Sequence, residues 1–220
     1  MTSTPIETEL TTAVTDILLA LVCWIAVLKI VQSPARHIER QQAAVWAIAF
    51  TLMALAAIVG TVIHGFEMKP ALQKWLDHPL YLFLGLAVSF FVAGVLIDLK
   101  RSALPIWIIA IPVVLGAAFY ALTVIRPGSF QVFILYEAGA LVFALGAYFY
   151  LWLRFQKSFS LWMMTGIALS ILAAGIQASG SASVQMIWTF DHNSLFHIIQ
   201  TVAIFVLMRG LLSRGFERTR

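Results

Sequence analysis

Charged side chains are scarce in this chain of 220 residues, and their scarcity excludes most soluble folds. Asp, Glu, Lys and Arg together make up 11% of the residues, whereas hydrophobic residues make up 61%. A soluble domain typically has about 25% charged residues. The apolar residues also gather in long runs, and one helical crossing of a hydrocarbon core needs about 20 such residues. We therefore expect an integral membrane protein.

Cysteine is almost absent as well. Cys23 is the only one, so the chain cannot form an intramolecular disulfide or a cysteine metal cluster. Its place within an apolar run, beside Trp24, indicates a packing role. The sequence also lacks short segments of alternating polarity, which are the signature of transmembrane barrels. The remaining class is an all-α polytopic membrane protein.

The apolar runs predict a seven-transmembrane-helix bundle that forms a single domain over residues 1–220. The first ten residues carry Glu7 and Glu9 where a cleavable signal would have a basic region, so we expect the first helix to anchor the chain. Proline and glycine mark the connections between the runs. The predicted helices cover about residues 10–32, 42–66, 79–98, 104–125, 131–154, 160–180 and 193–213.

Lys and Arg fall unevenly between the two ends of the predicted bundle. One end holds eleven of them: Lys29, Arg36, Arg40, Lys100, Arg101, Arg154, Lys157, Arg209, Arg214, Arg218 and Arg220. The other end holds three: Lys69, Lys74 and Arg126. The positive-inside rule then predicts a cytoplasmic C-terminus and an outside N-terminus, most simply in a bacterial inner membrane. Four tryptophans near the predicted cytoplasmic helix ends are typical of interfacial anchors: Trp46, Trp107, Trp152 and Trp162.

This loop charge also accounts for the basic balance of the chain, with a formal net charge of +4. No nucleic-acid partner is needed to explain it, and the bilayer is the expected partner. The oligomeric state stays open.

Ionisable residues are expensive inside a bilayer, so those within the predicted helices mark a candidate site. At 1.5 Å of rise per residue, Asp16 lies roughly two turns below the outer surface, and Glu137 lies about 9 Å below the start of its helix. His64 is in the last turn of helix two, and His197 is one or two turns into helix seven. All four fall in the outer third of the bundle.

Each of these residues also has a purely structural explanation. Asp16 would be satisfied by local partners such as Thr12 and Thr15. Glu137 would be protonated and hydrogen-bonded. A lone histidine near a helix end is most often an interfacial residue or a hydrogen-bonding partner between helices.

The combination of residues favours a site. Asn193 and His197 are four residues apart and share a helix face. Gly60 lies one turn from His64, and such a small residue lets another helix approach closely. Imidazoles and carboxylates at one depth suit zinc, which in catalytic sites has three protein ligands and an open position for water. Zinc is therefore the expected cofactor.

Two other functions remain open for the same residues. A non-enzymatic seven-helix sensor or receptor would use the pocket to bind a small ligand or to respond to pH through histidine. A haem- or quinone-binding protein would use His64 and His197. Retinal chemistry is excluded because the apolar span of helix seven contains no lysine, and transport is disfavoured because the polar residues gather at one end.

The helix count, the outside N-terminus and the placement of histidine on helices two and seven resemble the CREST superfamily of membrane hydrolases. This superfamily includes the alkaline ceramidases and the progestin and adiponectin receptors. Its pattern is Ser-x-x-x-His on helix two, an Asp early in helix three and His-x-x-x-His on helix seven, with the three histidines holding zinc. The alkaline ceramidases share the orientation predicted here, whereas the adiponectin receptors are inverted.

The resemblance assigns zinc ligation to His64 and His197. The chain departs from the pattern at two positions. Gly60 stands in place of the serine, although Thr61 offers a hydroxyl one position later. Asn193 stands in place of the first histidine of helix seven.

The third zinc ligand is left open by the resemblance, with His192, Asp16 and Glu137 as candidates. Asp77, just ahead of the predicted helix three, is the acid nearest to the position of the family Asp. The resemblance implies a hydrolase that cleaves an amide or ester of a membrane lipid with zinc-activated water. Asp16, Glu137 or Asp77 would then move the protons.

Overall fold

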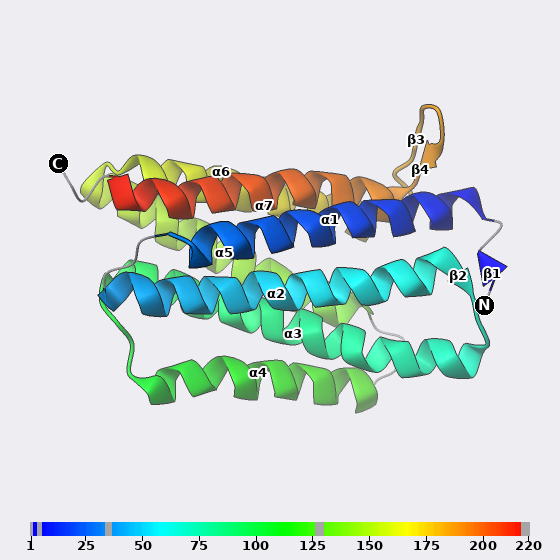
Figure 1. Cartoon of the computed structure of the whole chain (residues 1–220), viewed down its shortest axis with the longest axis horizontal. Coiled ribbons are helices and arrows are strands. Elements are labelled where there is room, and N and C mark those ends of the chain that lie inside the picture. The colour runs from blue at the N-terminus through cyan, green and yellow to red at the C-terminus, as the bar shows by residue number, and fades with distance from the viewer. Residues whose placement is uncertain (1, 4–5, 34–36, 126–129, 217–220) are drawn as a thin grey trace.

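The computed structural model describes residues 2–3, 6–33, 37–125 and 130–216. Within this part of the chain there are seven α-helices, each long and apolar enough to cross a membrane (Figure 1). They are α1 (Glu7–Val31), α2 (His37–Gly65), α3 (Pro70–Lys100), α4 (Ile106–Ile125), α5 (Phe130–Phe155), α6 (Ser158–Ser179) and α7 (His192–Phe216). Four of the basic residues used to predict orientation lie outside the described residues: Arg36, Arg126, Arg218 and Arg220.

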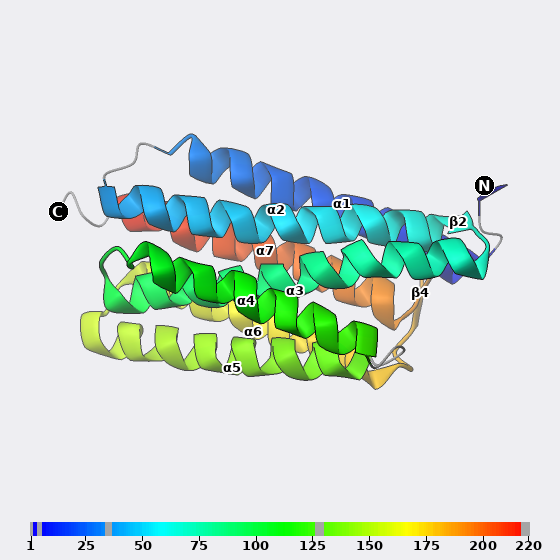
Figure 2. The same ribbon diagram turned by 90° about the horizontal axis from the view of Figure 1, so that it is seen from below.

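Successive helices run in opposite directions, so α1, α3, α5 and α7 all begin at one end of the bundle (Figure 1). We call this the N-terminal end, and the opposite end, where α7 finishes, the C-terminal end. The described helices pack into one elongated bundle, and α4 lies along the outside of α3 (Figure 2). The start of α1 and the end of α7 therefore lie at opposite ends, as an odd number of antiparallel helices requires.

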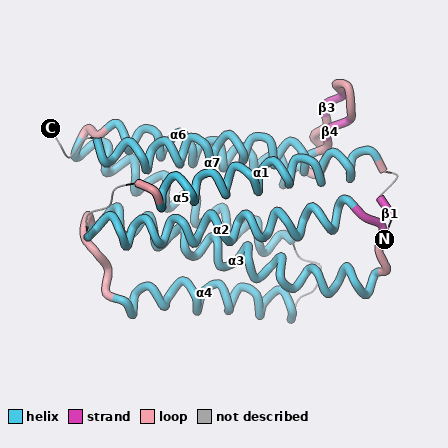
Figure 3. The backbone as a smooth tube through the Cα atoms, in the orientation of Figure 1, coloured by secondary structure: helices cyan, strands magenta, loops and turns pink. Residues whose placement is uncertain are grey.

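Two short strand pairs, which the sequence analysis did not expect, lie at the N-terminal end (Figure 3). The strand β1 (Thr2–Ser3) pairs antiparallel with β2 (Phe66–Glu67), and β3 (Val184–Gln185) pairs antiparallel with β4 (Thr189–Phe190). The β3–β4 hairpin is tied to α1, because the Thr189 amide donates to Glu7 Oε1 at 2.6 Å and Thr11 Oγ1 donates to the Thr189 carbonyl at 3.0 Å. These bonds set the start of α7 against the start of α1.

Helix α3 begins at Pro70, nine residues before the start expected at Pro79. Pro70 occupies the first turn, where the missing amide hydrogen has no helical partner in any case. Pro79 lies inside the helix, where an interior proline removes one backbone hydrogen bond. Membrane helices tolerate such prolines because neighbouring groups satisfy the freed carbonyl. As a result, Asp77 is within α3 rather than ahead of it.

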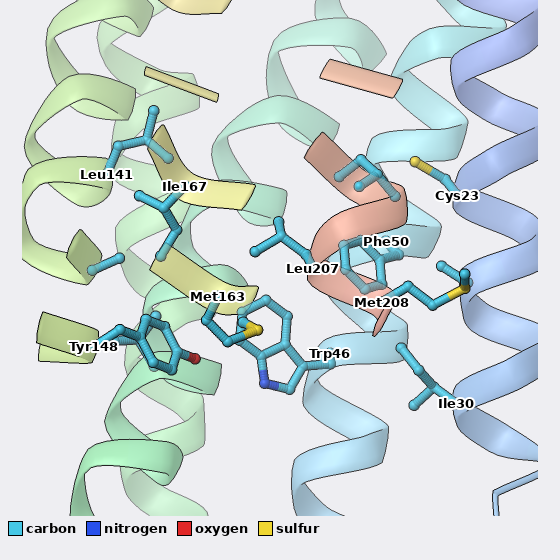
Figure 4. Close-up of a cluster of buried hydrophobic side chains, with 14 of the residues drawn as sticks. Cys23, Ile30, Trp46, Phe50, Leu141, Tyr148, Met163, Ile167, Leu207 and Met208 are labelled. Atoms are coloured by element: carbon cyan, nitrogen blue, oxygen red, sulfur yellow. The ribbon is translucent and has the colours of Figure 1, made fainter. Parts of the chain in front are cut away.

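The apolar core joins α1, α2, α3, α5, α6 and α7, and Figure 4 shows part of it around Trp46, Met163 and Leu207. Trp46 is fully buried, although its position in the sequence suggested an interfacial anchor. Its ring meets Phe91 edge-on, with 5.4 Å between centroids. A Cβ on Gly94 would lie 2.6 Å from the indole. The absent side chain of Gly94 therefore creates the space that draws Trp46 into the bundle.

A buried polar cluster, not identified from the sequence, closes the C-terminal end of the core. Asp98 of α3 is fully buried and accepts hydrogen bonds from Gln42 Nε2 of α2 and, at 2.6 Å, from the Tyr148 hydroxyl of α5. The cluster joins three helices through one carboxylate. On α5, the buried apolar residues Leu141 and Ala144 lie between Tyr148 and Glu137, so this cluster is separate from the polar residues at the other end.

Candidate functional site

A cavity of about 380 Å³ lies towards the N-terminal end of the bundle. Six helices contribute to its lining: α1, α2, α3, α5, α6 and α7. Ligand pockets usually measure about 300–1,000 Å³, and one water in the liquid occupies roughly 30 Å³. The cavity is therefore the size of a small molecule rather than of a single ion or water. Much of its wall is apolar, with residues such as Leu80, Leu84 and Phe133.

Most of the residues proposed from the sequence line this one cavity. They are Asp16, His64, Asp77, Glu137, His192 and His197. Thr61, proposed for its hydroxyl, is not part of the lining that the structure describes. Its hydroxyl donates to the Ala57 carbonyl of its own helix at 2.9 Å, and this bond satisfies it one turn back. Asn193 and His197, expected on one face, both face the cavity.

The most buried polar contact of the site joins α1 to α7. Oδ1 of Asp16 lies 3.3 Å from Nε2 of His197, and both residues are more than nine-tenths buried. Oγ1 of Thr15 lies 3.3 Å from Nδ1 of the same ring and donates its single hydrogen to the Thr12 carbonyl at 2.9 Å. Nδ1 of the ring thus lies against the Thr15 hydroxyl, and Nε2 faces the Asp16 carboxyl group.

Gly60 explains how the Asp16 carboxylate fits against α2. A Cβ at position 60 would lie 2.7 Å from Asp16 Oδ2, closer than real atoms approach. The carboxylate thus occupies the space that a side chain on α2 would fill. The small residue does permit close approach, as the sequence suggested, but it admits a side chain of α1 rather than a helix backbone.

His64 has a carboxylate partner that the sequence analysis did not name. Its Nδ1 lies 2.6 Å from Oε2 of Glu9, and both side chains are partly exposed. Because Nδ1 is engaged, Nε2 is the nitrogen left for another contact. The helical spacing of Glu9, Thr12 and Asp16, three and then four residues apart, places them on one face of α1 and was the signal available in the sequence.

Asp191 anchors the start of α7 and with it the histidines of the site. Its Oδ1 accepts hydrogen bonds from the Ser194 amide at 2.9 Å, the Ser194 hydroxyl at 2.8 Å and the Thr12 hydroxyl at 3.1 Å. Partial burial, the largest single influence, raises the pKa of Asp191, but these hydrogen bonds and the charge of His192 outweigh it and hold the pKa below its ordinary value. Thr12, expected to satisfy Asp16, instead bonds to this cap.

Glu137 and Gln200 lie where the main cavity adjoins a second, smaller one. Both residues also line this smaller cavity of about 40 Å³ and are more than nine-tenths buried. Nearer the N-terminal end of the main cavity, Gln177 of α6 donates from Nε2 to Asn193 Oδ1 at 3.5 Å. The polar lining therefore extends from His192 at the start of α7 to Gln200, more than two helical turns further in.

The described residues fit a zinc ion only in part. Two ligands of a tetrahedral zinc with bonds of roughly 2.0–2.1 Å are about 3.3 Å apart, and this is the separation of Asp16 Oδ1 and His197 Nε2. No group of three or more His, Cys, Asp or Glu side chains within the described ranges is arranged to hold a metal. His64, the expected partner, is directed to Glu9 through one nitrogen.

The chain belongs to a family of unknown function (DUF6962), whose model matches residues 11–215. No curated protein and no solved structure matches the chain. The matched segment contains every residue that lines the cavity, from Asp16 to Gln200.

Proposed function

We propose that this protein is an integral membrane receptor or binding protein that takes an amphiphilic small molecule into the cavity at its N-terminal end. The observation that carries the proposal is the cavity itself, about 380 Å³ in volume, with apolar walls and a few convergent polar groups. That combination is typical of ligand sites, in which apolar contacts supply affinity and polar groups fix orientation.

The proposed orientation puts the cavity in the outer half of the membrane. Among the helices described, the ends that carry Lys29, Lys100, Arg101, Arg154 and Lys157 all lie at the C-terminal end, which the positive-inside rule assigns to the cytoplasm. The N-terminal end then faces outward. A molecule in the outer leaflet would reach the cavity with its polar group against the carboxyl and amide side chains of the lining and its apolar part among the leucine and phenylalanine side chains.

Native mass spectrometry of the purified protein tests this proposal. Protein extracted in mild nonionic detergent should carry an endogenous adduct of small-molecule mass. Ala87→Phe, which places a ring in the lining, should abolish the adduct, because Ala87 is buried against both cavities. Ala118→Phe, on the exposed face of α4, is the matched control and should retain it.

If Ala87→Phe does not fold, Leu84→Trp fills the same cavity from a less buried position. Equal adduct in the filled variants and in Ala118→Phe would contradict the proposal. So would wild-type protein without any adduct.

A second candidate, a zinc-dependent hydrolase of a lipid amide or ester, is favoured by one specific observation. Asp16 Oδ1 and His197 Nε2 have the separation of two zinc ligands. Glu9 holds Nδ1 of His64 in the way that carboxylates hold metal-binding histidines. Zinc bound there would activate a water for attack on a carbonyl. This candidate agrees with the resemblance to the CREST hydrolases but still needs a third ligand.

Metal analysis separates the two candidates. A zinc enzyme should contain about one zinc per chain, and His197→Ala should lose it. His78→Ala is the matched control, because His78 makes an exposed contact with the Tyr120 hydroxyl and does not line the cavity. Zinc-free protein that still carries the adduct would exclude the hydrolase and leave the binding protein. The visible spectrum of the same sample tests the haem alternative.

A further inference from the structure

The cavity lining has an excess of hydrogen-bond acceptors. Six buried side-chain polar atoms have no hydrogen-bond partner within the described part of the chain, and four of them belong to residues that line the cavity. These four are Asp16 Oδ2, Glu137 Oε2, Gln177 Oε1 and Gln200 Oε1. All four are oxygens. An unsatisfied buried acceptor costs about 1–3 kcal/mol, so their concentration in one place points to an incoming donor.

The ionisable side chains of the lining also favour an incoming donor, and a positively charged one. Three carboxylates contribute to it, those of Asp16, Asp77 and Glu137, whereas no Lys or Arg of the described residues does. The two carboxyl–imidazole contacts in the described part of the chain join Glu9 to His64 and Asp16 to His197. Neither neutralises Glu137 or Asp77. The inner part of the cavity, where Glu137 lies beside the smaller cavity, thus carries a carboxylate without a described cationic neighbour.

We propose that the ligand of this cavity carries a protonated amine. An ammonium group has three donors and no acceptor, so it would serve the unpartnered oxygens of Glu137 and Gln200, which lie where the two cavities adjoin, and offset the charge of Glu137. A carboxylate or phosphate headgroup would bring further acceptors and a repulsive charge into the same space. An alcohol supplies one donor and no charge. The proposal rests on the cavity being a ligand site and specifies what that ligand is.

The apolar body of the ligand has a defined place beside the amine. The apolar walls of the cavity include Met53, Leu84, Val88 and Phe133 of α2, α3 and α5, and two of them, Met53 and Val88, also line the smaller cavity together with Glu137. They are apolar and offer the ligand no donor or acceptor side chain. An amine attached to a compact aryl or alkyl group would therefore bury its body there while its nitrogen meets the carboxylate.

Three matched compounds test the proposal directly: 4-phenylbutylamine, 4-phenylbutanol and 4-phenylbutanoate. They share one apolar body and differ in the polar group. Isothermal titration of purified wild-type protein in nonionic detergent at pH 7 should give an affinity for the amine at least about tenfold above that for the alcohol, since hydrogen bonds to charged groups contribute about 1.5–3 kcal/mol. The carboxylate should show no binding.

Substitution of the carboxylate locates the effect. Glu137→Gln keeps the shape of the side chain and removes its charge, so it should weaken amine binding about tenfold and leave alcohol binding unchanged. Should Glu137→Gln fail to fold, the comparison of the three compounds on wild-type protein still decides whether the ligand is an amine. Glu67→Gln, outside the cavity lining, is the matched control and should bind the amine as the wild type does.

The outcomes separate this inference from the proposed function. Equal affinity for the amine and the alcohol, or tighter binding of the carboxylate, overturns the amine while the cavity remains a ligand site. Absence of binding by all three compounds also overturns the amine, and the endogenous adduct then decides independently whether the cavity binds a ligand. Unchanged amine binding in Glu137→Gln overturns the assignment of the amine to this carboxylate.

Discussion

The carboxylate of Asp16 occupies the place where a side chain at position 60 would begin. A Cβ on Gly60 would lie 2.7 Å from Oδ2 and 3.1 Å from Oδ1 of that carboxylate. Oδ1 in turn lies 3.3 Å from His197 Nε2. The absence of a side chain on α2 thus allows α1 to present its acid to α7, and the three residues form one geometric unit.

Gly60→Ala should therefore disturb the site as well as the packing. The added methyl must push the Asp16 carboxylate away, and overpacking of this kind costs about 1–3 kcal/mol. We expect a lower melting temperature, followed by tryptophan fluorescence, and a loss of the adduct. Gly146→Ala is the control. A Cβ there meets nothing within 4 Å, and replacing a mid-helix glycine with alanine stabilises by about 0.5–1 kcal/mol.

A double-mutant cycle isolates the coupling between the two residues. In the Asp16→Ala background the methyl at position 60 finds free space, so Gly60→Ala should cost much less there than in the wild type. Stability losses that simply add up would show that the methyl clashes with something other than the carboxylate.

The sequence predicted the helices well because each one is specified locally. Six of the seven observed helices begin within about five residues of their expected starts, and the exception, α3, depends on whether a proline ends a helix or lies inside one. The local sequence cannot decide between these two places for the proline, because groups of neighbouring helices can satisfy the carbonyl that the proline leaves without a hydrogen bond. Trp46 was misjudged for a similar reason. Its burial depends on Gly94 of another helix, a tertiary fact absent from its own surroundings.

For the site, the depth of each residue along the bundle was predictable from the sequence, but the contacts between carboxyl groups and imidazoles were not. A constant rise per residue placed Asp16, His64, Glu137 and His197 at one level, and these residues do line one cavity. Which carboxylate meets which imidazole depends on the rotation of each helix about its axis. A small error in that rotation would make Asp16, rather than Glu9, the partner of His64. The sequence alone therefore could not assign the ion pairs.

The cap on α7 makes a pH-dependent contribution to stability. Folding lowers the pKa of Asp191, so its charged form stabilises the fold at every pH above the unfolded value of about 3.9. That contribution is lost as the pH falls through the lower, folded value. We expect the melting temperature of the wild type to exceed that of Asp191→Asn by a constant margin from pH 7 to about 4.5, and the margin to shrink below about pH 4.

Asp191→Ala removes the hydrogen-bond acceptor as well as the charge. It should cost about 0.5–2 kcal/mol, as the loss of a helix N-cap does. Because the cap fixes the start of α7, amine binding at the cavity should weaken too. A margin between wild type and Asp191→Asn that stays constant down to pH 3 would contradict the role of the charge.

The buried cluster at the C-terminal end should matter for stability alone. Tyr148→Phe removes the hydroxyl that donates to Asp98 at 2.6 Å, and leaving a buried acceptor without its donor costs about 1–3 kcal/mol. We expect a lower melting temperature with unchanged ligand affinity, because Leu141 and Ala144 separate the cluster from Glu137 along α5. Tyr150→Phe should change neither the melting temperature nor the ligand affinity, because Tyr150 is 54% exposed. A ligand effect of Tyr148→Phe would show coupling between the two ends.

The proposed orientation is testable with single cysteines, because the native thiol is hidden. Cys23 is fully buried, so a membrane-impermeant maleimide should leave wild-type protein unlabelled in intact cells. Ile187, in the β3–β4 hairpin, is 85% exposed, and Ser158 at the opposite end is also exposed. In the proposed orientation, which is based on the eleven-to-three division of Lys and Arg, the hairpin is outside. Ile187→Cys should therefore react in intact cells, and Ser158→Cys only after permeabilisation. The reverse pattern would show that the bundle has the opposite orientation. The cavity would then lie in the cytoplasmic half of the membrane, where a ligand in the outer leaflet could not reach it.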